Sequence, residues 1–366
     1  MQSNHTNNMG GGGNKLENLS HHCKETKPNP LAIFIKDKKR WILSLVKNSK
    51  QHQKLKAELA QLQINLDSTQ LKLLDSIKQN QILQNQLKSQ ESKIKLQDSK
   101  LTKLTPQSYL RILEIHLAEH CNLNCFSCNH FSQLAPKGFP DILQFKQDME
   151  RLSNLTFGLV GRFHLMGGEP LLNPNCKDFF QVTRKYFPKS AIWLVTNGIL
   201  LESQPKDFWE SCRENKIEIH PTKYPIKVNW EVIEQKCKDF GIPLIFYDNS
   251  NIQKTSYKTI LDLKGSLDSL NGFSYCHQAN NCTHFKNGKI YPCSIAPNIQ
   301  YFNAAFHQNL PITPIDFIDI YKAKDYHEIL QFLAKPIPFC RFCNLAKWKS
   351  IGEWKTSKKE IGEYLE

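Results

Sequence analysis

Long apolar runs are missing from this sequence. No stretch approaches the roughly twenty apolar residues that a membrane-spanning helix needs, so we do not expect a transmembrane protein. An apolar signal segment is missing as well, because the first 13 residues are mostly polar or glycine. We therefore expect a cytoplasmic protein whose twelve cysteines stay reduced instead of pairing in disulfides.

Glycine and proline are absent from Lys36 to Thr105, a stretch rich in lysine, glutamine and leucine. The spacing of its apolar residues predicts a coiled coil of about 50 residues, about 75 Å long at 1.5 Å per residue. Such an apolar seam needs a partner, either further copies of this chain or another coiled-coil protein. The residues of the seam, which changes phase once, are Leu55, Leu59, Leu62, Leu66 and Leu73, then Leu83, Leu87, Ile94, Leu101 and Leu104.

Acidic residues are scarce in the same part of the chain. Residues 31–105 hold 15 Lys or Arg and 6 Asp or Glu, a surplus of 9 in a chain of net charge +14. A solvated helical face explains this surplus best. Residues 33–47 alternatively form a basic amphipathic helix that lies on an anionic membrane or on a partner. Nucleic-acid binding is not expected, since only Phe34 and Trp41 interleave the charges and no readout motif is present.

Three cysteines stand close together in the middle of the chain, at Cys121, Cys125 and Cys128. Three thiolates are one ligand fewer than a closed tetrahedral zinc site or a fully ligated iron-sulfur cubane needs. The loop would therefore leave one metal with an open coordination position, where chemistry can take place. A zinc loop completed by His120 or His130, or ordinary core cysteines, are the alternatives.

Two further motifs follow at the ends of predicted strands. The glycines of Gly167-Gly168-Glu169-Pro170 allow a sharp turn and a close approach to a ligand, and the carboxylate of Glu169 can accept hydrogen bonds from an ammonium group. Thr196-Asn197-Gly198 ends a short apolar run that is typical of a buried parallel strand. Each motif alone is also an ordinary turn.

Strand and helix patterns alternate through this region. Strands are expected at 113–117, 163, 192, 217–220 and 242–247, and helices at 143–155, 176–186, 205–212 and 228–240. Such βα units predict an α/β fold with a parallel sheet and right-handed crossovers. Ligands then belong at the carboxyl ends of the strands, where all three motifs fall. Periodicity alone does not separate a barrel from a doubly wound sheet.

Together these motifs resemble the radical S-adenosylmethionine superfamily. The resemblance implies a partial (β/α)6 barrel over residues 106–265, after a disordered tail (1–30) and the basic helical or coiled-coil region (31–105). It also implies that the cysteine triplet binds an oxygen-sensitive 4Fe-4S cluster. The unique iron of that cluster chelates S-adenosylmethionine, whose sulfonium one electron cleaves to a 5′-deoxyadenosyl radical. An electron donor such as flavodoxin or ferredoxin is the expected partner.

The resemblance also gives the other motifs roles. Glu169, in the Gly167-Gly168-Glu169-Pro170 motif, holds the amine of the cofactor, which Thr196 and Asn197 face. Two departures from the family pattern bear on the substrate and not on the cluster. Ser127 stands where many relatives have an aromatic residue, and residues 220–225 lack the acidic turn common in members that modify peptides.

The last hundred residues, 266–366, carry a second set of cysteines. Asn287-Gly288 between extended runs predicts a two-residue hairpin. The spacing of Cys276, Gly288 and Cys293 resembles the opening of SPASM and twitch domains, which implies a small α+β domain with one auxiliary 4Fe-4S cluster. A zinc ribbon is the alternative. Five cysteines compete for four ligand positions, with Cys293 the first choice, the Cys340/Cys343 pair next, and Cys276 and Cys282 unranked.

Two classes of function fit these features. The first is a radical enzyme that abstracts a hydrogen atom from a substrate held by the C-terminal domain. Its substrate is a sugar or nucleotide-sugar of cell-surface biosynthesis or, alternatively, a peptide or protein. The second is a non-catalytic iron-sulfur protein whose coiled coil serves assembly. The intact triplet together with the Gly-Gly-Glu-Pro motif favours the enzyme.

Overall fold

The computed structural model describes residues 30–45, 50–247 and 253–366, and the chain divides into two units, 1–91 and 92–366. The predicted tail lies, apart from Pro30, outside the described residues. Among the described residues, no helix combines the length and apolar character needed to cross a bilayer.

The N-terminal region is helical, as its lack of glycine and proline predicts. Helix α2 runs over Pro30–Leu45 and α3 over Lys50–Leu104. The 55 residues of α3 span about 82 Å at 1.5 Å per residue. Leucines of the predicted seam such as Leu62, Leu66 and Leu73 are exposed in the single chain. The long helix is thus confirmed, and its pairing remains a prediction.

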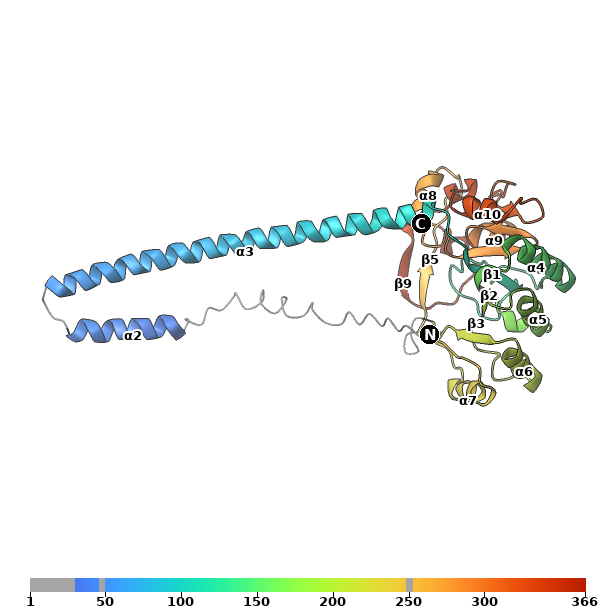
Figure 1. Ribbon diagram of the computed structural model, residues 1–366, viewed down its shortest axis with the longest axis horizontal. Coiled ribbons are helices and arrows are strands. Elements are labelled where there is room, and N and C mark those ends of the chain that lie inside the picture. Colours follow the sequence, from blue (N-terminus) through green and yellow to red (C-terminus); the bar gives the residue numbers. More distant parts are fainter. Residues whose placement is uncertain (1–29, 46–49, 248–252) are drawn as a thin grey trace. The chain divides into compact units, whose positions relative to one another are not determined.

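The second unit is built on a seven-stranded sheet in the order β4-β3-β2-β1-β6-β7-β8 (Figure 1). Strands β1 to β4 are parallel neighbours, and β6 runs parallel to β1 on its other side. Strands β7 and β8 continue the sheet antiparallel. The strands are β1 (Leu110–Ala118), β2 (Val160–Gly167), β3 (Ala191–Thr196), β4 (Ile217–Pro221), β6 (Thr283–Lys286), β7 (Lys289–Tyr291) and β8 (Ile318–Asp319).

Four helices connect the parallel strands and contribute to one apolar core. They are α4 (Ile142–Thr156), α5 (Cys176–Tyr186), α6 (Lys206–Glu214) and α7 (Trp230–Phe240), and each matches a helix that the sequence predicts. Alternate strand residues enter that core, for example Leu113 and Ile115 of β1 and Phe163 and Leu165 of β2. The partial barrel is confirmed in this arrangement of repeated βα units.

The predicted extended segment 242–247 forms only an isolated parallel bridge, between Leu244 and Ile219 of β4. Proline 243 lies inside this segment and has no N–H to offer a ladder. Its carbonyl accepts a hydrogen bond from the Ile219 N–H, and the Ile245 N–H returns one to the Ile219 carbonyl. The segment therefore runs parallel to β4 and pairs with it through one bridge, without forming a full strand.

The C-terminal hundred residues contribute to both apolar cores. Phe285, Ile290 and helix α10 (Tyr326–Leu333) join the first core, and most of the other buried apolar side chains pack around a second. The hairpin β6–β7 turns at Asn287 and Gly288, with φ of 50° and 70°, which confirms the predicted two-residue turn. Because β6 pairs with β1, this hairpin belongs to the same sheet as the βα units. The remaining elements are α8 (Ser269–Tyr275), α9 (Ile295–Phe306), the 3₁₀ helices η3 (Pro338–Phe342), η4 (Leu345–Lys347) and η5 (Ile361–Glu363), and a β5 (Thr255–Lys258)–β9 (Lys349–Glu353) pair.

The exposed seam of α3 leads to a first prediction. We expect the full chain to form a dimer or trimer at micromolar concentration, because a row of leucines that a single helix cannot bury stabilises association. Leu66→Glu with Leu73→Glu should convert it to monomer in light scattering. Gln61→Glu with Ser68→Glu adds the same charge away from the seam and should leave the assembly intact. A monomeric wild-type chain would show that the seam serves a different partner.

Candidate functional site

Three motifs meet where neighbouring parallel strands end. The cysteine loop, residues 119–130, follows β1, the Gly-Gly-Glu-Pro motif follows β2 into the 3₁₀ helix η2 (Pro170–Leu172), and Thr196-Asn197 closes β3. The sheet order β3-β2-β1 makes these three strands adjacent. The carboxyl edge of the sheet therefore gathers residues that lie up to about eighty positions apart in the sequence.

The two glycines are required by backbone packing against the end of β1. A Cβ on Gly167 would lie 2.3 Å from the Ala118 carbonyl oxygen, and one on Gly168 would lie 2.0 Å from that of His120. The Gly168 N–H donates to the Ala118 carbonyl at 2.8 Å, and the Glu169 N–H to the His120 carbonyl at 3.1 Å. The two glycines were expected to let the backbone approach a ligand closely. In the structure, the backbone at these glycines closely approaches the end of β1 and the start of the cysteine loop.

The carboxylate of Glu169 joins the second motif to the third. It is fully buried and accepts hydrogen bonds from the Thr196 hydroxyl at 2.7 Å, the Asn197 N–H at 2.9 Å and the Leu171 N–H at 3.1 Å. Burial raises the pKa of Glu169 to about 7 in spite of these donors. A carboxylate has about four lone-pair sites, so one remains for a further donor.

The cysteine triplet lies against the same group of residues. Burial raises the pKa of Cys121, and the negative charges of Glu169, Cys128 and Cys125 raise it further. The side-chain amide of Asn197 donates to the Cys121 sulfur at 3.8 Å. The three thiols and the two strand-end motifs thus form one cluster.

Residues 354–364 clamp the cysteine loop from the far end of the chain, which the sequence analysis did not foresee. Ser127 is buried with φ of 50°, and its N–H donates to the Glu363 carboxylate at 3.1 Å. The Tyr364 hydroxyl donates to the Cys128 carbonyl at 2.9 Å. The hydroxyl of Ser127, the departure from the family pattern, accepts a hydrogen bond from the Thr259 N–H at 2.9 Å. No local sequence pattern indicated the contacts of Glu363 and Tyr364.

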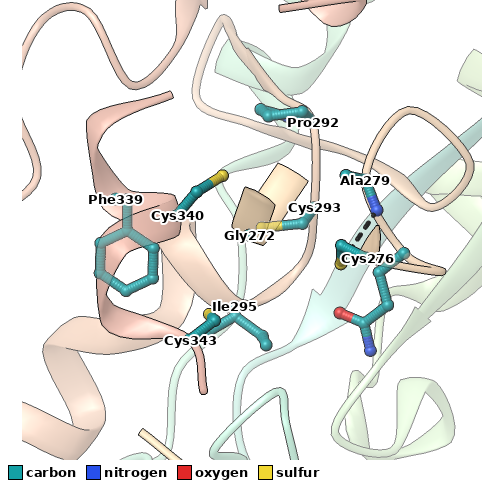
Figure 2. Close-up of a pocket in the computed structure, with 10 residues that line it drawn as sticks. Gly272, Cys276, Ala279, Pro292, Cys293, Ile295, Phe339, Cys340 and Cys343 are labelled. Carbon is teal, nitrogen blue, oxygen red and sulfur yellow. Dashed lines mark hydrogen bonds between the residues drawn. The ribbon is translucent and has the colours of Figure 1, made fainter. Parts of the chain in front are cut away.

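Four of the five C-terminal cysteines line one hollow (Figure 2). Cys276 follows α8, Cys293 follows β7, and Cys340 and Cys343 belong to and follow η3. Burial raises the pKa of Cys340 to about 12. It also raises the pKa of Cys293 and the pKa of Cys343 above their usual values. Gly272 and Ala279 complete one side of the hollow.

Cys282 does not line this hollow. It directly precedes β6, and its thiol lies beside the Glu114 carboxylate of β1. Burial, followed by that negative charge, raises the pKa of Cys282 to about 12. Of the two cysteines that the spacing left unranked, Cys276 therefore lines the hollow together with Cys293, Cys340 and Cys343, and Cys282 does not.

No three His, Cys, Asp or Glu side chains within the described ranges converge tightly enough to hold a single metal ion. Cys176, Cys212 and Cys237 are buried in the apolar core, away from both groups of cysteines described above. No disulfide links the cysteines of the described segments. Cys23 lies outside the described residues.

Comparisons with known proteins give several relatives. The chain is 35% identical over 91 residues to the S-adenosyl-L-methionine-dependent 2-deoxy-scyllo-inosamine dehydrogenase of Niallia circulans, which covers 25% of this chain and 36% of that protein. It is 29% identical over 99 residues to the GTP 3′,8-cyclase of Rhodopirellula baltica, covering 26% and 27%. A longer match joins it to the GTP 3′,8-cyclase of Aquifex aeolicus, 24% identical over 269 residues, 68% of this chain and 81% of that one.

The similarity to the first two relatives spans about a third of their length. Among solved structures, BtrN in complex with AdoMet and 2-DOIA covers 65% of this chain and 94% of its own, with a TM-score of 0.43 and 20% identity. No family model matches the chain.

The packing of Gly168 on the cysteine loop leads to a second prediction. Gly168→Ala should destabilise the fold by about 1–3 kcal/mol, because the new methyl group overlaps backbone atoms that cannot move aside separately. Urea unfolding measures this difference. Gly362→Ala is the matched control, since a Cβ there meets no atom within 4 Å. If both variants were equally stable, the backbone of the cysteine loop would be able to move away from the new methyl group without a cost in stability.

Proposed function

Because the chain belongs to the radical S-adenosylmethionine superfamily, we propose that it is an enzyme that cleaves S-adenosylmethionine reductively and abstracts a hydrogen atom from a substrate. The observation that carries this proposal is the convergence of the cysteine triplet, Glu169 and Asn197 at one edge of the sheet. An electron donor such as flavodoxin or ferredoxin would supply the electron.

The residues of this edge fit the cofactors. The triplet offers three thiol ligands and no fourth, which suits a 4Fe-4S cluster with one open iron. When bound, such a cluster would supply the electron that cleaves the sulfonium to a 5′-deoxyadenosyl radical. Glu169 has one acceptor site left for the ammonium group of S-adenosylmethionine, and a cation there would favour its ionised form.

The protein's own residues would orient and protect the cluster and the S-adenosylmethionine. Glu169 holds the ends of β2 and β3 at a fixed separation, so that Thr196 and Asn197 stay beside the cofactor site. The 354–364 segment fixes the backbone of Ser127 and Cys128 and covers one side of the cysteine loop. Both contacts preorganise the ligands before the cofactors bind.

We further propose an auxiliary 4Fe-4S cluster in the C-terminal hollow. Its ligands would be Cys276, Cys293, Cys340 and Cys343, whose four thiols complete the coordination of a cubane. A fully ligated cluster leaves no open iron, so this site would transfer electrons or support the fold. A zinc ion is the alternative occupant.

For the substrate we propose a sugar or nucleotide-sugar. The relative from Niallia circulans is named a 2-deoxy-scyllo-inosamine dehydrogenase, which supports this proposal. Peptide modification and a purely structural role remain the alternatives. Product analysis would distinguish them, since the first gives a modified peptide and the second gives no product.

The third prediction tests the enzyme itself. Replacing Cys121, Cys125 and Cys128 together by Ala should remove about four irons per chain and abolish 5′-deoxyadenosine formation, because the open-site cluster loses all its protein ligands. Iron analysis and chromatography of the reduced, anaerobically reconstituted protein measure both. Persistent cleavage in the triple variant would refute the proposal.

The fourth prediction separates Cys282 from the auxiliary ligands. In the triple-Ala background, adding Cys293→Ala should remove the remaining iron, whereas adding Cys282→Ala should leave it. The two substitutions delete the same thiol at either end of one hairpin and so serve as matched controls. Equal iron loss in both would return Cys282 to the ligand set, and one zinc without iron would favour the zinc ribbon.

A further inference from the structure

The inner face of the sheet carries a continuous row of polar and aromatic side chains. Strand register pairs Glu114 of β1 with His164 of β2 on one side and with His284 of β6 on the other. His164 in turn pairs with Trp193 of β3, which pairs with Glu218 of β4. These five residues, which we call the polar row, alternate with the strand residues that enter the apolar core.

The polar row contains buried atoms without a partner in the protein. They are Oε2 of Glu114, Nε2 of His164 and both ring nitrogens of His284. His284 is 0% exposed and Glu114 6% exposed. A buried polar atom left unpaired costs about 1–3 kcal/mol, and the great majority of such atoms are paired in folded proteins. Their concentration in three adjacent residues therefore points to hydrogen-bonding groups from outside the chain.

His116 shows that this fold can satisfy a buried imidazole on the same face. Its Nδ1 lies 3.0 Å from the Glu119 carboxylate, and its Nε2 lies 2.8 Å from Nδ1 of His130. The ring of His284 packs edge-on against that of His116, 4.6 Å between centroids, yet makes no hydrogen bond. On this face, the paired ring of His116 thus contrasts with the unpaired ring of His284 beside it, and Nε of Arg162 is unpaired as well.

The polar row is open from the side of β2 to β4. The side chains of His164 and Glu218 remain 14% and 31% exposed, whereas Glu114 and His284 are enclosed. A ligand entering from that side would reach Glu114 last. Glu114 stands four residues before the end of β1, about 13 Å along the strand. The row would therefore hold a part of the substrate that is remote from the cofactor edge.

The chemistry of the row favours uncharged hydroxyl groups. Glu114 offers an acceptor, and a neutral imidazole offers one donor and one acceptor, which match a hydroxyl that can do both. Of the nearby cations, Lys286 pairs with Glu119 at 2.9 Å. The Arg162 guanidinium lies 3.6 Å from the centre of the Trp193 ring, and its Nε makes no hydrogen bond. Arg162 is thus the residue beside the row that an anion would meet, and the GTP measurement below tests for such binding.

We propose that Glu114, His164 and His284 form a binding site for the hydroxyl-rich, uncharged portion of the substrate. This inference rests on the proposed function and assigns it a substrate subsite. Binding of that portion would contribute binding free energy from a part of the substrate that does not react. Loss of the subsite should thus weaken binding and leave the cofactor edge unchanged.

The first experiment needs no ligand. His284→Phe replaces an unpaired imidazole by an apolar ring and should keep or raise the melting temperature, since binding residues commonly cost stability. His116→Phe removes a paired imidazole from the same face and should lower it. If His284→Phe lowers the melting temperature as much as His116→Phe, the ring has internal partners such as bound water, and the proposal is wrong.

The second experiment measures binding of maltose, glucosamine, myo-inositol and GTP to the reconstituted full chain by saturation-transfer NMR. At least one of the three polyols should bind, and both Glu114→Gln and His284→Phe should weaken it at least tenfold. No polyol binding, equal binding by the variants, or GTP binding that depends on Glu114 would each overturn the assignment.

A final measurement separates this inference from the proposed function. Formation of 5′-deoxyadenosine without substrate is measured on the wild type alone. Absent cleavage in the wild type refutes the proposed function, while the binding results still decide the subsite.

Discussion

The buried carboxylate of Glu169 holds the functional edge of this molecule together. It binds the ends of β2 and β3 through Leu171, Thr196 and Asn197, while the glycines before it pack on the end of β1. Removing the carboxylate would leave the buried donors unpaired and release the Asn197 amide from the Cys121 sulfur. Geometry at the cysteine loop thus depends on a group that is not itself a thiol, and burial of this group raises its pKa to about 7.

The sheet has two faces of opposite character. Parallel sheets are usually covered by apolar contacts on both sides, but here the face opposite the helices carries Glu114, His164, Trp193 and His284. Filling that face with aliphatic side chains would stabilise the fold and remove any polar binding surface. The molecule thus gives up stability on one face of the sheet, as functional sites commonly require.

Local sequence patterns were sufficient to predict the βα units, the hairpin at Asn287-Gly288 and the three motifs at the strand ends. Each depends on spacing within a dozen residues. The choice between Cys276 and Cys282 could not be predicted, because it depends on which way the chain faces as it enters β6. The contact of Ser127 with Glu363 joins residues 236 positions apart, and no local pattern encodes it. By contrast, Pro243 stands in the sequence, and its missing N–H is a local reason why the segment 242–247 forms one bridge and not a full strand.

The contacts of Glu363 and Tyr364 with the cysteine loop affect when that loop can take its shape. A ribosome adds about 5–20 residues per second, so the loop waits on the order of ten seconds or more before its clamp has been synthesised. During that interval three thiols are exposed without a fixed geometry and are open to oxidation or to capture by stray metal ions. Assembly of the proposed cluster would therefore succeed best once residues 354–364 have been synthesised, and a fusion that displaces these residues would impair it without touching a single cysteine.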